Sequence, residues 1–275
     1  HSKCSARKGV WVRIPPPALK DRSMEYTSYV AIGDSFTEGM GDHWPDGGER
    51  GWADLTAIGL GRAAGAPIRY ANLAIRGRKL APVIAEQLEP AIALRPDLVS
   101  INGGGNDMLR PTMTPAIVAD QLIAAAERAA EAGISVLLLS GADPSGHLPM
   151  GTVFRRRGEE LTDAVQTRLD RLAGADVVLC DNFGDVELRD PGYWSDDGLH
   201  LNSRGHHRVA GNVLQSLGVA APPEFAQIAS AELPDTNYRS SAYWRAHVLP
   251  WIGRRLTGRS SGDGRAPKRP HLEPL

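Results

Sequence analysis

Residues 33–39 read Gly-Asp-Ser-Phe-Thr-Glu-Gly and directly follow a short apolar run at residues 29–32. A strand that ends in Gly-Asp-Ser and turns into a helix places the Ser35 hydroxyl on a sharp corner, where backbone N–H groups face the same space. Nucleophilic acyl transfer uses this combination, because the hydroxyl attacks the acyl carbon while the amides stabilise the oxyanion. A Gly-Asp-Ser triplet is expected by chance in roughly one chain of this length in ten. The prediction therefore depends on what the other segments supply.

Short apolar runs alternate along the chain with longer stretches of helical period. Five runs rich in Val, Ile and Leu fit strands that are covered on both faces, at residues 29–32, 68–73, 98–102, 134–140 and 176–180. Helices are predicted at residues 52–64, 79–94, 115–132, 154–173 and 203–217. This alternation predicts an α/β fold, a three-layer α/β/α sandwich with a five-stranded parallel sheet that is flavodoxin-like, in an order such as 2-1-3-4-5. Ligands bind such sheets beyond the carboxyl ends of the strands, so the site residues are sought there.

Glycine-containing loops follow the second and third predicted strands. Gly77 lies in the turn into the next helix, where its backbone N–H can face the site, and a simple turn glycine is the alternative. Residues 103–107 read Gly-Gly-Gly-Asn-Asp, so the backbone can approach a ligand closely, and the Asn106 amide is a neutral donor suited to an oxyanion hole. An Asx turn and a phosphate-cradling loop are the alternatives. No Lys-Ser or Lys-Thr pair follows, which disfavours a nucleotide P-loop.

The loop after the fifth predicted strand holds a candidate acid and base. His200 immediately precedes the last helix, and Asp197 lies three residues before it. A turn can bring this carboxylate to one ring nitrogen of His200, which fixes the tautomer and leaves the other nitrogen facing a serine. Asp-x-x-His is frequent by chance, and it gains weight here from its place in the order of elements.

Ser35 in Gly-Asp-Ser, Gly77, Asn106 in Gly-x-Asn-Asp and His200 in Asp-x-x-His together resemble the four blocks of the GDSL/SGNH hydrolase superfamily. The resemblance spans most of the chain and implies the SGNH hydrolase fold. It implies that Ser35 is the nucleophile, His200 the general base and Asp197 the acid that orients His200. It also implies an oxyanion hole formed by the Ser35 and Gly77 N–H groups and the Asn106 side chain.

The implied enzyme is a carboxylic ester hydrolase, a GDSL/SGNH serine esterase or lipase. Ser35 attacks the acyl carbonyl while His200 takes its proton, and water then releases the acid from the acyl-enzyme, so we expect neither a metal nor a cofactor. We expect a small-molecule substrate, a short- to medium-chain acyl ester. The alternatives are a lysophospholipase, an acyl thioesterase, a carbohydrate deacetylase and, outside this class, a non-catalytic binding module.

Candidates for the substrate pocket lie in two loops. Trp44 follows the nucleophile segment, and His147, Leu148 and Met150 follow the fourth predicted strand. Packing within the loops is the alternative for each. The adjacent histidines 206 and 207 are expected to face solvent from the last helix rather than to bind zinc.

Composition restricts the partners. The chain of 275 residues is 42% hydrophobic and 23% charged with a formal net charge of −1, which gives no attraction to nucleic acid. Apolar runs stay short of ~18 residues, so no transmembrane helix or stable membrane insertion is predicted. Without a recognisable secretory signal, we expect a cytoplasmic protein. The sequence indicates no particular oligomeric state.

The chain is predicted to have four parts. The first is a disordered leader or cloning-derived segment, because it is basic and contains a triple-proline run that neither continues a helix nor joins a central strand. The SGNH hydrolase catalytic domain, an arm packed on it and a flexible tail rich in Gly, Ser, Arg and Pro follow. Their bounds are residues 1–23, 24–222, 223–256 and 257–275. The Trp-rich stretch 241–256 fits a membrane-surface helix as an alternative, although Pro250 interrupts it.

Overall fold

One mostly parallel sheet organises the protein. The computed structural model describes residues 26–110, 112–147, 151–230, 238, 240, 245 and 260–275. Within them the strand order is β5-β4-β3-β1-β2-β6. The first five strands pair in parallel and confirm the predicted order 2-1-3-4-5. They are β1 (Ser28–Ile32), β2 (Arg69–Asn72), β3 (Leu98–Ile101), β4 (Ser135–Leu139) and β5 (Val177–Cys180).

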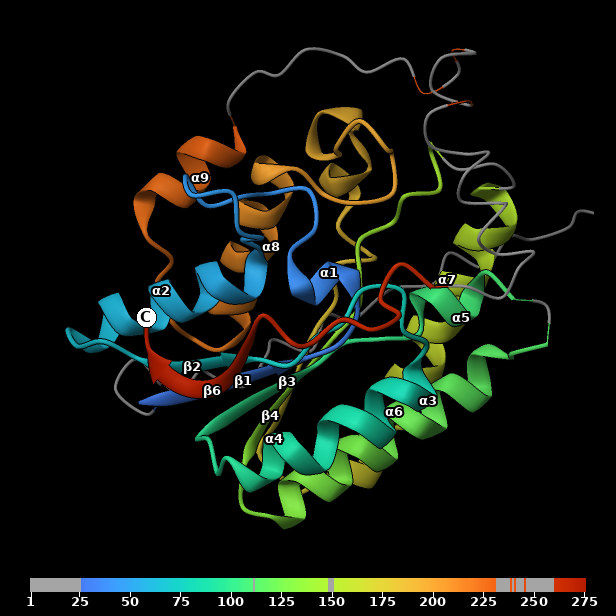
Figure 1. The fold of residues 1–275 in the computed structure, drawn as a ribbon. Coiled ribbons are helices and arrows are strands. Elements are labelled where there is room, and N and C mark those ends of the chain that lie inside the picture. The colour runs from blue at the N-terminus through green and yellow to red at the C-terminus, as the bar shows by residue number, and fades with distance from the viewer. Residues whose placement is uncertain are drawn as a thin grey trace, which may run out of the picture.

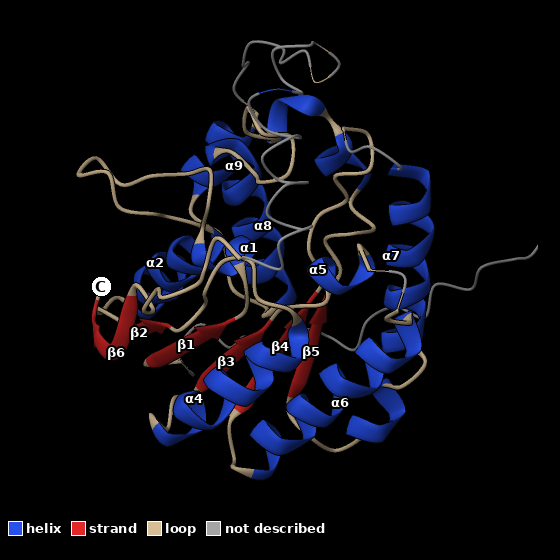
Figure 2. Ribbon diagram, turned by 45° about the vertical axis from the view of Figure 1, so that its right-hand side comes forward, coloured by secondary structure: helices blue, strands red, loops and turns tan. Residues whose placement is uncertain are grey.

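Helices cover both faces of the sheet, which gives the predicted three layers (Figure 2). All residues of β1 and β3 are buried, and alternate residues of β1 belong to two separate cores. One core packs against α2 (Trp52–Ala64), α8 (Ser203–Ser216) and α9 (Pro223–Ala229). The other packs against α3 (Leu80–Val83), α4 (Glu89–Ala93), α6 (Pro115–Glu131) and α7 (Gly151–Gln166).

The helix predicted at residues 79–94 is interrupted. A π-helical turn, η1 (Ile84–Leu88), separates α3 from α4. Pro90 has no N–H to donate within the helix, so regular α-helical bonding cannot continue unchanged through this region. The helix predicted at 154–173 likewise ends early, at Gln166, and the 3₁₀ turn η2 (Leu169–Leu172) follows it.

Short elements carry the loops at the carboxyl edge of the sheet. Neither α1 (Ser35–Glu38) nor α5 (Gly105–Met108) extends beyond about one turn. The loop between β5 and α8 contains the 3₁₀ turns η3 (Val186–Arg189) and η4 (Pro191–Tyr193). α1, α5 and this loop follow the carboxyl ends of β1, β3 and β5, so they gather at one edge of the sheet (Figure 1).

A sixth strand corrects the predicted five-stranded sheet. β6 (Arg269–Pro274) pairs antiparallel with β2 at the sheet edge, inside the segment predicted to be a flexible tail. Its sequence gave no strand signal because most of its residues are exposed, and its two prolines are tolerated only on an edge strand. The predicted leader lies outside the described residues, as does the stretch 241–256 apart from Arg245.

Candidate active site

Ser35 occupies the predicted corner between β1 and α1. It is half-buried and is the first residue of α1, and the preceding Asp34 is the N-cap whose carboxylate accepts the Phe36 N–H at 3.1 Å. A Cβ atom added to Gly33 would lie 2.4 Å from Thr37 Oγ1, so the turn favours glycine at this position. Among the described residues, no acceptor binds the backbone N–H of Ser35. The corner therefore offers a hydroxyl and an unoccupied amide.

Gln87 holds this corner from the other side and was not predicted. Its Oε1 accepts the Gly33 N–H at 2.8 Å, and its Nε2 donates to the Gly33 carbonyl at 3.0 Å. Gln87 is 2% exposed and lies in the π-helical turn, between Val83 and Ala91 on a buried stripe. A polar residue on an apolar stripe is the sequence signal that would have identified it.

Asp197 and His200 are brought together as predicted. His200 Nδ1 lies 2.6 Å from Asp197 Oδ2, while Asp197 Oδ1 accepts the Leu199 and His200 N–H groups, both at 2.9 Å. Burial acts to raise the pKa of Asp197, but the interactions with His200 and the two backbone N–H groups outweigh it and lower that pKa. The carboxylate therefore stays ionised and holds the proton of the imidazole on Nδ1. The side chain of the neighbouring acidic residue, Asp196, is exposed, whereas Asp197 is half-buried.

The second ring nitrogen of His200 does not bind Ser35 directly. In the described part of the chain no hydrogen bond joins the Ser35 hydroxyl to His200. Catalytic hydrogen bonds are often long in ligand-free sites and shorten when substrate binds.

Asn106 lies against the nucleophile turn through Asp34. Its Nδ2 donates to Asp34 Oδ2 and to the Arg78 carbonyl, both at 3.0 Å. Both amide hydrogens thus face protein acceptors, so a substrate oxyanion must share or replace one of them. Burial raises the pKa of Asp34 to about 6, and Asp107 adds to the shift, against the opposing effects of the Phe36 N–H, His200 and Asn106.

Gly77 follows β2 at the same edge. Its φ of +74° is in the left-handed region, and its N–H has no acceptor among the described residues. The preceding Arg76 donates its backbone N–H to Glu38 Oε2 at 2.7 Å and its Nε to Glu38 Oε1 at 2.9 Å, which ties this loop to α1. Arg76 also reaches Glu49 Oε1 at 2.8 Å. No sequence motif pointed to this buried cluster.

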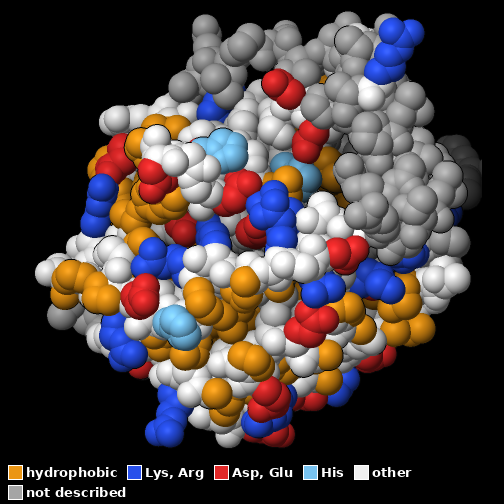
Figure 3. Space-filling view, in the orientation of Figure 1, with side chains coloured by type: hydrophobic (Ala, Val, Ile, Leu, Met, Phe, Trp, Pro, Cys, Tyr) orange, Lys and Arg blue, Asp and Glu red, His pale blue; other side chains and the backbone are white. Residues whose placement is uncertain are grey.

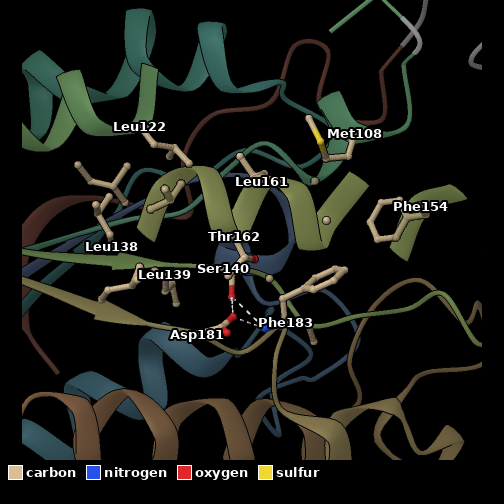
Figure 4. Close-up of a pocket in the computed structure, with 17 residues that line it drawn as sticks. Met108, Leu122, Leu138, Leu139, Ser140, Phe154, Leu161, Thr162, Asp181 and Phe183 are labelled. Carbon is tan, nitrogen blue, oxygen red and sulfur yellow. Dashed lines mark hydrogen bonds between the residues drawn. The ribbon is translucent and has the colours of Figure 1, made fainter. Parts of the chain in front are cut away.

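An apolar cavity opens between the sheet and α7, beside α5 (Figure 4). Its volume is about 80 Å³, room for roughly two or three water-sized groups. Gly105, which precedes Asn106, lines it, together with apolar residues that include Ile101, Met108, Leu122, Leu138, Phe154 and Leu161. At one end the Ser140 hydroxyl donates to Asp181 Oδ1 at 2.9 Å.

Two of the four predicted pocket residues, Trp44 and His147, lie elsewhere. Trp44 is half-buried and stacks under the Arg50 guanidinium, 5.6 Å from its ring centroid. His147 packs against Trp194 and Tyr238, with ring centroids 5.5 and 4.6 Å apart. Neither lines the apolar cavity, and their contact with substrate stays a prediction. Leu148 and Met150 lie outside the described residues.

The expectation that His206 and His207 face solvent is wrong. Their exposed fractions are 0% and 3%. His206 Nδ1 accepts the Trp52 N–H at 3.1 Å, and its Nε2 lies 3.1 Å from the Met40 carbonyl, so the ring bridges α2 and the nucleophile loop. Burial lowers the pKa of His206 to about 4. The expectation failed because α2, α9 and the nucleophile loop cover this face of α8, where His207 also packs edge-on against Phe225 with ring centroids 5.2 Å apart.

The described residues contain no group of three or more His, Cys, Asp or Glu side chains placed to hold a metal. Within the same ranges, every helix is too short or too polar to cross a membrane. On the face shown in Figure 3, acidic and basic side chains are interspersed, so the part of it that is described offers no continuous basic track for a nucleic acid backbone.

Comparisons with known proteins identify structures of the same fold and a matching family. A search of curated proteins finds no match. Among solved structures, TesA is 27% identical, with a TM-score of 0.56 over 69% of this chain and 97% of that one. Two further structures share the fold. A lipase from a goat rumen metagenome is 18% identical, with a TM-score of 0.58 over 70% of this chain and 98% of that one. An acetylxylan esterase from Geobacillus stearothermophilus is 19% identical, with a TM-score of 0.57 over 70% of this chain and 94% of that one. The model of the GDSL-like lipase/acylhydrolase family matches residues 31–208. The chain therefore belongs to the GDSL-like lipase/acylhydrolase family.

Proposed function

We propose that this hydrolase is a serine esterase for short- to medium-chain acyl esters, with Ser35, His200 and Asp197 as its triad. The observation that carries the proposal is the 2.6 Å hydrogen bond between His200 and Asp197, in the loop beyond the carboxyl end of β5, with Ser35 beyond the carboxyl end of β1 in the same parallel sheet. A carboxylate on Nδ1 leaves Nε2 as a base for a serine hydroxyl. Membership of the family supports a hydrolase of this kind.

The reaction proceeds in two steps. His200 Nε2 takes the proton of the Ser35 hydroxyl as its oxygen bonds to the acyl carbon, and the carbonyl oxygen becomes an oxyanion. The N–H groups of Ser35 and Gly77, which have no acceptor in the described part of the chain, can donate to it, and Asn106 donates when its bond to Asp34 is released. Collapse expels the alcohol, which takes the proton from His200. Water activated by His200 then releases the acid and restores Ser35.

The apolar cavity is the proposed site for the acyl chain. It adjoins Gly105, next to the oxyanion donor Asn106, and its lining is apolar apart from the Ser140 end. A volume of about 80 Å³ suits a short chain of on the order of three carbon atoms, because a cavity of about 150 Å³ holds benzene. Such a cavity favours acyl groups longer than the acetyl group of an acetylated carbohydrate, because a single methyl group would leave part of it unfilled.

The substrate class is tested with a chain-length series of p-nitrophenyl esters, run beside acyl-CoA, lysophosphatidylcholine and acetylated xylo-oligosaccharide. We expect the highest kcat/KM on esters with acyl groups of about three to six carbon atoms, and no turnover by the Ser35→Ala variant. Preference for acyl-CoA or lysophosphatidylcholine would replace the ester assignment with one of these. Full turnover by Ser35→Ala would contradict the proposed mechanism.

The cavity is tested with Leu161→Trp on α7. The larger ring fills the cavity, so kcat/KM should fall roughly tenfold or more for butyrate esters while acetate esters are little affected. Val153→Trp is the matched control, because Val153 lies on the same helix but is 40% exposed. An equal loss for all chain lengths, or no loss, would remove the cavity from acyl binding.

A further inference from the structure

The C-terminal residues 260–268, here termed the strap, run past the loop that follows β2 before the chain enters the sheet as β6 (Figure 1). We propose that the strap is a positioning element of the active site, which holds residues 75–77 so that the Gly77 N–H points to the oxyanion. This inference rests on the proposed function. The strap lies outside residues 31–208, so the family match does not account for it.

The strap and the loop meet backbone to backbone. Gly262 is buried, and a Cβ on it would lie 2.1 Å from the Arg76 carbonyl oxygen and 2.8 Å from Ile75 Cγ2. Ser260 packs on Gly77 itself, since a Cβ there would lie 2.3 Å from Ser260 Oγ. Contacts this close leave the loop no room to move toward the strap.

Hydrogen bonds fix both ends of the strap. The Ser260 N–H donates to Asp263 Oδ2 at 2.8 Å, and the Gly262 N–H donates to Ser260 Oγ at 3.2 Å, which closes residues 260–263 into a turn. At its other end, Lys268 Nζ donates to Asp54 Oδ2 at 2.6 Å and to the Glu49 carbonyl at 3.0 Å. β6 then fastens the chain to the sheet.

The opposite side of the loop is held by acidic residues. Glu38, on the nucleophile helix α1, accepts both the backbone N–H and the Nε of Arg76, and Glu49 accepts a second guanidinium N–H. Residues 75–77 are therefore clamped between α1 and the strap. Because an oxyanion donor must be held within a few tenths of an ångström, loss of one side of the clamp should weaken transition-state binding more than substrate binding.

Gly262→Ala tests the strap, because the new methyl group must push it away from Arg76. We expect kcat per titrated active site to fall about tenfold, while KM changes less than about twofold. Affinity for a boronic acid that mimics the tetrahedral intermediate should fall in parallel. The rate of hydrogen exchange at the backbone amides of residues 75–78 should rise. Gly211→Ala on α8 is the matched control, because its Cβ meets nothing within 4 Å, and it should change none of these. Ser260→Ala, a milder change, should lower kcat about threefold if Gly262→Ala does not fold.

Two parallel variants separate this inference from the proposed function. Ser35→Ala should be inactive, and Asn106→Ala should lower kcat by about 10² to 10³. Turnover by Ser35→Ala would overturn the proposed function. An inactive Ser35→Ala beside strap variants with unchanged kcat, boronate affinity and hydrogen exchange would overturn the strap inference alone.

Discussion

Asp34 joins the nucleophile turn to the Asn106 loop and is 6% exposed. Burial raises its pKa to about 6, so its charge changes close to neutral pH. In the folded protein the carboxyl therefore binds a proton that the unfolded chain, with a pKa near 4, has already released between about pH 4 and 6. The folded state loses stability as the pH rises through this window.

Asp34→Asn tests this shift, because the amide does not titrate. The stability of the variant relative to the parent should rise by up to about 3 kcal/mol between pH 4 and pH 7, whatever its constant offset. Urea denaturation at several pH values measures the difference. A difference that stays constant over this range would show that the pKa of Asp34 is close to its ordinary value.

Single residues were predictable where their signal is local. Ser35, Asp197 and His200 lie within a few positions of a strand or helix end, and the structure places Asp197 against His200 as the spacing predicts. Gln87 and the Arg76–Glu38 pair were not predicted, because each contact joins residues 38 or more positions apart. A local pattern can mark Gln87 as a polar residue on an apolar stripe, but it does not identify the distant partner of Gln87 or of Arg76.

At the level of elements, His206 is the contact that fixes α8 against the nucleophile region. Its imidazole accepts the first N–H of α2 and faces the Met40 carbonyl, which is possible only for the neutral ring. Burial lowers its pKa to about 4, below the value near 6.5 expected for the unfolded chain. Between these values the unfolded chain binds the extra proton, so stability falls as the pH falls.

His206→Gln should remove this dependence. Relative to the variant, the parent should lose up to about 3 kcal/mol of unfolding free energy between pH 6.5 and pH 4. Thermal or urea unfolding of both proteins across this range gives the comparison. Parallel stability curves would mean that His206 is not held neutral by the fold.

Elements were predictable in proportion to their hydrophobic pattern. The five parallel strands are short apolar runs, and the sequence showed all of them because burial on both faces leaves little alternation. β6 has no such pattern, since it lies at an edge and owes its place to pairing with β2. The π-helical turn was not predicted, because the apolar residues of this stretch keep a helical spacing through it. The spacing does not show how the flanking prolines change the hydrogen bonding.

At the scale of the whole molecule, the end of the described chain is joined to the core. Lys268 is 17% exposed and Asp54 1%, and the Asp54 carboxylate also accepts the Gly51 N–H at 3.0 Å at the start of α2. Burial raises the pKa of Asp54 in spite of Lys268, so the lysine offsets only part of the desolvation. This pair links β6 and the strap to the helix layer above β2.

Lys268→Met should leave the Asp54 carboxylate buried without its cation. The free energy of unfolding is expected to fall by about 3 kcal/mol, and the double variant with Asp54→Asn should recover a large part of it, because the uncompensated charge is removed. Equilibrium urea denaturation of the single and double variants measures both effects. A loss below about 0.5 kcal/mol for Lys268→Met would show that the pair does not hold the edge of the sheet.

The central claim is that Ser35 is the nucleophile, and covalent labelling tests it most directly. Incubation with an alkyl fluorophosphonate, followed by peptide mass spectrometry, should place one phosphonyl group on Ser35 and abolish ester hydrolysis in proportion to labelling. The Ser35→Ala variant should take up no label and turn over no ester. An adduct on another residue, or ester turnover by the fully labelled enzyme, would contradict the account.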